Sequence, residues 1–135
     1  MRLTLSKTEF SPGETVSGTL ELEMKKPIPA EKLTLSLIYF IPTEDFTDVI
    51  EKTFVLQTLD GIREYGTSRY EFNIEIPANP PEIEFPPDSD PEMIETWKKD
   101  DALGVNCLSV LGQLDIRGQK PLRKIVDIKI RYSDI

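Results

Sequence analysis

An alternating stretch, residues 15–24, constrains the fold of this chain more than any other feature. Apolar or small residues occupy its even positions, and polar residues occupy the odd ones: Thr15, Ser17, Thr19, Glu21 and Glu23. Successive side chains of a strand point to opposite faces, so this pattern predicts one face in a core and one in water. A lone strand cannot bury its apolar row, and other segments must therefore supply an opposing layer.

Several further segments have strand character, with short alternating or apolar runs bounded by turn residues. They lie near residues 3–6, 33–41, 50–59, 70–76, 104–116 and 126–132. Ile38 and Phe40 are apolar on the face opposite the leucines, which predicts that the strand at residues 33–41 is either covered on both sides or central in its sheet. Residues 104–116 fit either a buried strand or a strand with a bulge at Gly112. About seven strands without alternating helices predict an all-β, antiparallel, immunoglobulin-like β-sandwich.

The connection at residues 77–101 departs from this pattern because it is rich in proline. Prolines stand at positions 77, 80, 81, 86, 87 and 91, and no sheet interior tolerates such a density. The connection contains the one helix that the sequence predicts. Asp90 is suited to cap it, Pro91 to begin it, and Trp97 to dock its short apolar face on the sandwich.

Phe85 and Trp97 are the candidate partner-binding residues, because both are large apolar side chains that belong to no predicted strand. A long connection in a compact domain is usually functional or disordered, and its prolines reduce the entropy lost on ordering. The connection therefore has two interpretations: a recognition loop for a protein partner, or a structural lid over one end of the sandwich.

Composition predicts a single domain, residues 1–135, and narrows the classes of partner. The net charge of −8 argues against nucleic acid and anionic lipid as partners. No apolar run approaches the roughly 20 residues that span a bilayer. The first residues show no signal-peptide core, and the lone Cys107 excludes an internal disulfide, so we expect a cytoplasmic protein. A charged fraction of 30% with few amide residues fits the thermophile pattern.

Chemistry that usually marks an enzyme is sparse in this sequence. Histidine is absent, which removes the commonest general base and metal ligand, and no glycine-rich phosphate loop occurs. Cys107 lies among apolar residues and is predicted to be an inert core thiol. We therefore predict no catalytic, cofactor or metal residues. The alternatives are a carboxylate- or metal-dependent hydrolase, or a calcium- or carbohydrate-binding sandwich that uses the acidic loop at residues 88–92.

The order of turns and strands resembles that of arrestin-like sandwiches. Those domains have a Pro-Gly-Glu turn before a strand with Val and Gly, here residues 11–18. They continue with an aromatic strand ending in Ile-Pro, here residues 70–77, and a Gly-Val strand, here residues 104–107. Related sandwiches occur in the arrestin-like subunit of retromer and in bacterial sporulation-control proteins. The resemblance implies a non-enzymatic interaction or scaffold domain with a protein partner and no cofactor.

Two departures limit what the resemblance implies. Arrestin-like proteins usually pair two sandwiches, whereas this sequence has room for one. The paired phosphate-sensing lysines of receptor-binding arrestins have no counterpart between Met1 and Lys7. We therefore do not expect binding to phosphorylated receptors. The exposed edges of the sheets offer a second kind of contact, homo-oligomerisation through edge strands.

Overall fold

A computed structural model describes residues 1–99, 107–130 and 132 of the chain. The described residues form ten strands and one helix. They are β1 (Arg2–Leu5), β2 (Glu9–Phe10), β3 (Thr15–Leu22), β4 (Ile28–Ala30), β5 (Lys32–Pro42), β6 (Val49–Asp60), β7 (Arg63–Tyr65), β8 (Ser68–Glu75), α1 (Pro91–Lys99), β9 (Cys107–Asp115) and β10 (Leu122–Ile130). Within this part of the chain, no helix has the length and hydrophobicity needed to cross a bilayer.

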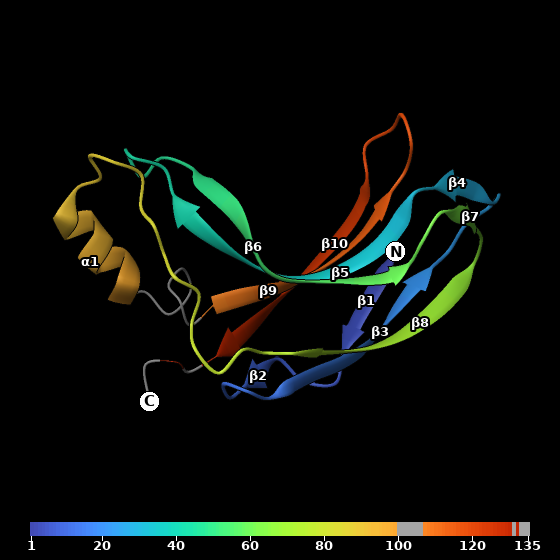
Figure 1. Cartoon of the computed structure of the whole chain (residues 1–135), viewed down its shortest axis with the longest axis horizontal. Coiled ribbons are helices and arrows are strands. Elements are labelled where there is room, and N and C mark those ends of the chain that lie inside the picture. Colours follow the sequence, from blue (N-terminus) through green and yellow to red (C-terminus); the bar gives the residue numbers. More distant parts are fainter. Residues whose placement is uncertain (100–106, 131, 133–135) are drawn as a thin grey trace.

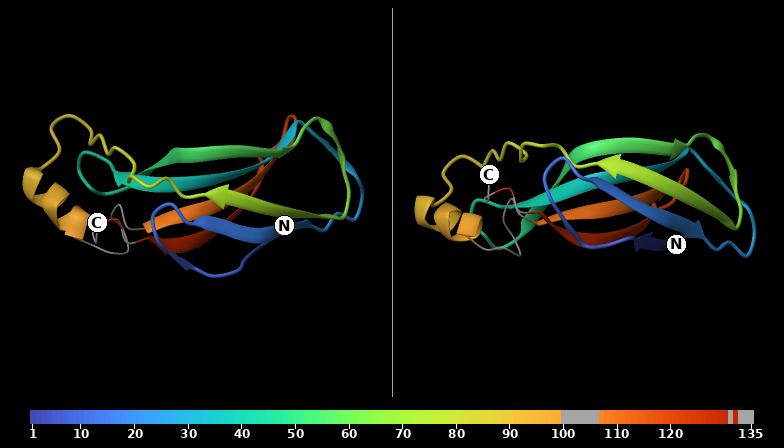
Figure 2. Two further views of the ribbon diagram at one scale, coloured as in Figure 1. Left: turned by 60° about the horizontal axis from the view of Figure 1, so that its bottom comes forward. Right: turned by 90° about the horizontal axis from the view of Figure 1, so that it is seen from below.

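The strands form two main sheets that pack face to face (Figures 1 and 2). One sheet has the order β1-β3-β8, and the other has the order β2-β10-β9-β5-β6. A small third sheet, β4-β7, lies at one end of the sandwich, and α1 lies beyond the other end (Figure 1). The architecture confirms the all-β sandwich that the sequence predicted.

Strand β3 has the register that its alternation predicted. Val16, Leu20 and Leu22 are buried in the core between the sheets. On the opposite face Thr15 is exposed, whereas Ser17, Thr19 and Glu21 are half-buried. Because β3 pairs with both β1 and β8, cross-strand neighbours cover part of this polar row.

Strand β5 is central, as predicted, because it lies between β9 and β6. Its leucines face the other sheet, while Ile38, on the opposite face, is also fully buried. The neighbouring β9 is a buried strand, and its pairing with β5 and β10 runs without a shift through Gly112. Instead, the irregularities lie between β5 and β6, at Leu33/Thr34 and Leu37/Ile38.

Three short strands were not predicted. The sequence indicated plain connections at residues 25–29 and 61–66, but β4 and β7 pair there, with Pro29 inside β4. Strand β2 pairs in parallel with β10, so the sandwich is not purely antiparallel. Two or three residues are too few to show a period of two, and their partners lie far away in the sequence.

Candidate functional site

The helical end of the sandwich comprises residues 43–48 between β5 and β6, the connection at residues 77–90, and α1. The helix begins as predicted: the Glu92 backbone N–H donates to the Asp90 carboxylate at 2.9 Å, and the Ile94 N–H donates to the Asp90 carbonyl at 3.0 Å. Glu92 lies in the first turn, where the helix dipole favours a negative charge. These features fix where α1 starts, and therefore which side chains it presents to the rest of this end.

The structure brings the two predicted partner-binding residues together. The rings of Phe85 and Trp97 pack edge to face, with centroids 5.4 Å apart and planes at 90°. Trp97 is only 7% exposed, whereas Phe85 is half-buried. Trp97 lies outside the main core cluster between the sheets. The pair therefore forms a small apolar centre of its own, which ties α1 to the connection.

A tight turn holds the connection between Phe85 and α1. The Ser89 hydroxyl and backbone N–H both donate to the Pro86 carbonyl oxygen, at 2.7 and 3.3 Å. Asp88 has a φ of 67°, a left-handed conformation that Asp tolerates better than most residues. The turn reverses the chain just before Asp90, which places Phe85 where Trp97 can reach it.

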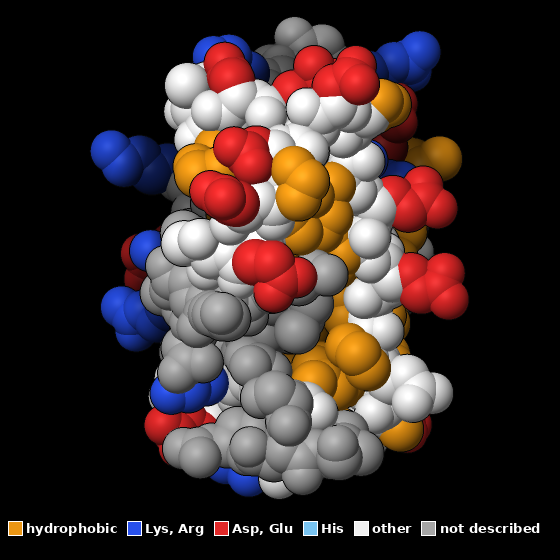
Figure 3. Space-filling view, turned by 90° about the vertical axis from the view of Figure 1, so that its left-hand side faces the viewer, with side chains coloured by type: hydrophobic (Ala, Val, Ile, Leu, Met, Phe, Trp, Pro, Cys, Tyr) orange, Lys and Arg blue, Asp and Glu red, His pale blue; other side chains and the backbone are white. Residues whose placement is uncertain are grey.

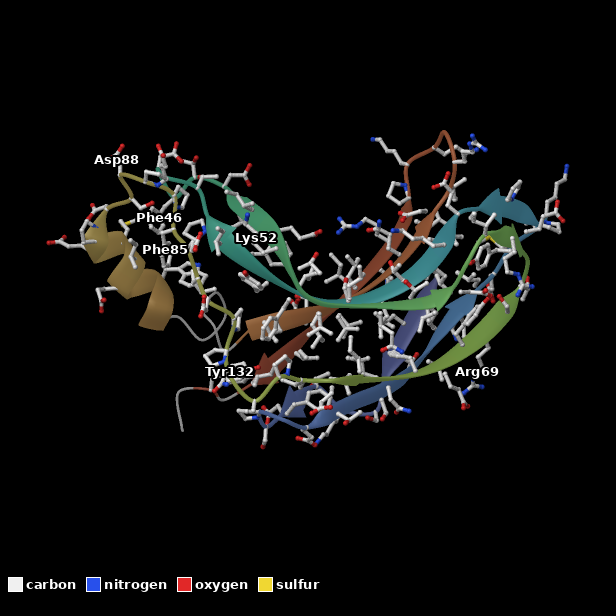
Figure 4. All side chains as sticks on the ribbon, viewed as in Figure 1. Phe46, Lys52, Arg69, Phe85, Asp88 and Tyr132 are labelled. Atoms are coloured by element: carbon white, nitrogen blue, oxygen red, sulfur yellow. The ribbon has the colours of Figure 1, made fainter. Side chains whose placement is uncertain are left out.

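The turn between β5 and β6 forms the other side of the helical end. The Asp45 carboxylate accepts hydrogen bonds from the hydroxyls of Thr43 and Thr47 and from the Thr47 N–H. The bond from the Thr47 hydroxyl, followed by that from Thr43, lowers the pKa of Asp45 below its ordinary value. Phe46 has a φ of 57°, which is unusual for a bulky residue. Figure 4 places Phe46 and Phe85 in the same region, between β6 and α1.

A shallow hollow of about 430 Å³ joins the turn to the connection, because Ile50 and Pro86 line it together with residues 43–45. Seen from this end, apolar side chains form a band with acidic side chains on both sides (Figure 3). Met93 of α1 is 43% exposed and Ile50 is 36% exposed. Sequence reasoning missed Phe46, Ile50 and Met93, although the long apolar side chain of Phe46 in an acidic turn was a signal.

The helical end carries a concentrated negative charge. Residues 43–51 and 77–97 contain no lysine or arginine, and Lys98 and Lys99 follow only at the end of α1. The two ranges contain ten acidic residues: Glu44, Asp45, Asp48, Glu51, Glu82, Glu84, Asp88, Asp90, Glu92 and Glu95. A protein surface docking here would match this charge best with a positively charged rim.

The described carboxylates do not show the arrangement that the hydrolase and calcium-binding alternatives would need. Among the residues that the structure describes, no three side chains of His, Cys, Asp or Glu gather as a metal site. In the acidic loop, Asp90 caps α1 and the Ser89 hydroxyl is bonded to Pro86. A carboxyl that acts as a general acid needs a raised pKa, whereas hydrogen bonds lower the pKa of Asp45 and Asp60.

A second hollow, of about 420 Å³, lies on the outer face of the three-stranded sheet. Polar side chains such as Ser17 and Asn73 line it, and Glu71 is its one carboxylate. It therefore provides no pair of carboxylates for glycoside hydrolysis. The side chain of Cys107 lies outside the part of the chain that the structure describes, and its predicted burial remains a prediction.

No protein-family model matches the sequence, and no curated protein matches it. Among solved structures, the chain is similar to Spo0M, a sporulation control protein from Bacillus subtilis, with a TM-score of 0.66 and 19% sequence identity. The match covers 96% of this chain and 47% of the Spo0M chain, so the chain spans about half of that protein's length. At this level of identity the likeness concerns the fold, which is that of an arrestin-like sandwich.

Proposed function

We propose that this chain is a non-enzymatic protein-interaction or scaffold domain of arrestin-like type, which needs no cofactor. Its fold favours this class, because the arrestin-like fold is generally non-enzymatic. The observation that carries the proposal is the band of apolar side chains at the helical end, bordered by acidic residues (Figure 3). An apolar centre within a charged rim is the usual anatomy of a protein interface.

In this proposal the two aromatic residues have different roles. Trp97 is buried against Phe85 and acts as the anchor that keeps α1 in place. The half-buried Phe85 and the exposed Met93 contact the partner directly. The connection is thus both the lid and the recognition surface. The partner is a protein with apolar residues surrounded by lysine or arginine.

The test is to recover bound proteins from the native source with the wild-type chain and with single variants. Met93→Asp replaces an exposed apolar side chain of α1 by a charge, and we expect it to abolish partner recovery at an unchanged melting temperature. Ile125→Asp is the matched control, since Ile125 is 39% exposed on β10, away from the helical end. Equal recovery of the same partner by both variants would contradict the proposed site.

A further inference from the structure

Strand β6 is a free edge of the larger sheet. It has 12 residues, and among the described strands only β5 pairs with it. The opposite edge of this sheet, β2, has 2 residues, and β1, an edge of the smaller sheet, has 4. Strand β8, the other edge of the smaller sheet, has 8 residues, but Arg69, Glu71 and Glu75 lie along it. Such charges discourage pairing between edges. The charges of β6, Glu51, Lys52 and Asp60, lie toward its two ends, so the uncharged centre of this long edge is a ready template for another strand.

The composition of β6 favours pairing. Residues 53–59, Thr-Phe-Val-Leu-Gln-Thr-Leu, contain no charge, proline or glycine, which is the pattern of segments that associate as strands. Leu56, in the middle of this segment, is 60% exposed. Lys52 precedes the segment and Asp60 follows it, so opposite charges frame an uncharged centre.

We propose that β6 pairs antiparallel with β6 of a second copy of this chain, about a two-fold axis at Leu56. In this register the two Leu56 side chains meet on the axis, and Lys52 of each copy lies opposite Asp60 of the other. Ile50 of one copy, which is 36% exposed, comes next to Ile62 of the other copy. Ile62 lies in the turn after β6 and is 87% exposed. A shift of the axis to either neighbouring residue removes all three matches.

The distribution of charge along the molecule also favours the antiparallel arrangement. Strand β6 begins at the acidic turn, residues 43–48, and ends at the opposite end of the sandwich (Figure 1). That end carries Lys25 and Lys26 before β4, Arg63 in β7, and Arg117 and Lys120 between β9 and β10, together with Glu31, Asp60, Glu64 and Asp115, so it lacks the concentrated negative charge of the other end. Antiparallel pairing therefore keeps the two acidic ends apart, whereas parallel pairing places them side by side.

Local geometry is compatible with this pairing at the centre of the strand. The register shifts between β5 and β6 leave Val55, Leu56, Gln57 and Thr58 in regular pairing with β5. The irregularities lie on either side of this segment and increase the local twist, so the Lys52–Asp60 match beyond them is a contact between side chains. Asp60 accepts hydrogen bonds from Tyr70 at 2.8 Å and Arg63 at 3.1 Å, which hold its carboxylate in place beside Lys52 of the other copy.

The first test measures molar mass by light scattering over a range of protein concentrations. We expect the wild-type chain to reach twice the 15.4 kDa of one chain, and Leu56→Asp to remain at that of one chain. Lys52→Glu, which faces Asp60 of the other copy, should weaken dimerisation about tenfold. Ile125→Asp on the same sheet is the control and should dimerise normally. A wild-type chain that stays monomeric, or a Leu56→Asp dimer, overturns the proposal.

The second test reads the register. In a Cys107→Ser background, Leu56→Cys should form a disulfide between copies on mild oxidation, because directly opposed residues of antiparallel strands lie within disulfide reach. Thr58→Cys is the matched control. In this register residue 58 of one copy lies opposite Phe54 of the other copy, not opposite residue 58, so the variant should not cross-link. Cross-linking of both variants, or of Thr58→Cys alone, contradicts the register. This interface shares Ile50 with the helical end but does not use Phe85 or Met93, on which the proposed function rests, so its failure leaves the proposed function standing.

Discussion

The Tyr132 hydroxyl donates a hydrogen bond of 2.7 Å to the carbonyl oxygen of Pro77. Tyr132 follows β10 and is 5% exposed, while Pro77 is the first residue of the proline-rich connection. The bond therefore ties the last strand of the larger sheet to the segment that leaves β8 in the smaller one. It fixes the direction in which the connection departs toward α1 (Figure 4).

Tyr132→Phe keeps the ring and removes this hydrogen bond. We expect the free energy of unfolding to fall by about 1–3 kcal/mol, because the half-buried Pro77 carbonyl loses its partner beside the buried Tyr132 ring. Denaturant unfolding measures the change. Tyr39→Phe is the control, since the Tyr39 hydroxyl has no hydrogen bond in the described structure and its ring packs on Phe54. Equal effects of the two substitutions would show that the Pro77 bond contributes nothing.

The buried tyrosines predict a loss of stability at alkaline pH. Burial raises the pKa of Tyr132 from 10.0 to about 12, and burial together with the Asp60 charge raises that of Tyr65 to about 12. Folding therefore favours the neutral phenols. Their contribution is complete below pH 10 and is lost as the pH rises toward 12, because the unfolded chain ionises first. Unfolding free energies measured across this range should decline.

The double variant Tyr65→Phe/Tyr132→Phe is the matched control for this decline. Without the two phenols, the free energy of unfolding should depend less on pH between 10 and 12. Ultraviolet absorbance of tyrosinate in the wild-type chain provides a second measurement. If Tyr65 and Tyr132 ionised near 10 in the native state, the burial argument would be wrong.

Much of the sandwich was predictable from the sequence because its long strands have a period of two. The alternation of residues 15–24 predicted that the face of β3 with Leu20 points into the core. Asp90 and Pro91 identified the start of α1. Strands β4 and β7 were not predictable, since their pairing joins short segments separated by 32 residues or more, such as Ala30 and Arg63. Their formation depends on tertiary contacts rather than on local pattern.

The candidate site was only partly predictable. Phe85 and Trp97 were identified because they are large apolar side chains outside every predicted strand. Their contact, however, depends on the turn at Asp88 and Ser89. A left-handed residue that is not glycine leaves little trace in the sequence. Phe46 was missed for the same reason, since its own left-handed conformation lies within a turn.

A side chain at Gly112 of β9 would press on the opposite sheet. A Cβ atom there would lie 2.5 Å from Leu20 Cδ1, and Leu20 is fully buried. Gly112→Ala should therefore lower the free energy of unfolding by about 1–3 kcal/mol through overpacking. Gly66→Ala is the control, because its Cβ would meet nothing within 4 Å.

A double-mutant cycle checks the mechanism for Gly112. Shortening Leu20 should make room for the new methyl group, so Gly112→Ala/Leu20→Ala should cost less than the sum of the two single changes. Thermal or denaturant unfolding of the four proteins gives the coupling free energy. Strictly additive effects would mean that the two residues do not press on each other.

The register of β3 gives the last prediction. Leu20 is fully buried between the sheets, whereas Thr19 is half-buried on the outer face beside Thr4 and Glu71, its cross-strand neighbours in β1 and β8. Leu20→Ala should lower the free energy of unfolding by about 2–5 kcal/mol, because it removes buried methyl groups and leaves a cavity. Thr19→Ala should cost much less, since its face lies against water. Because a slip of one residue exchanges the two faces, equal losses for the two variants would refute this register.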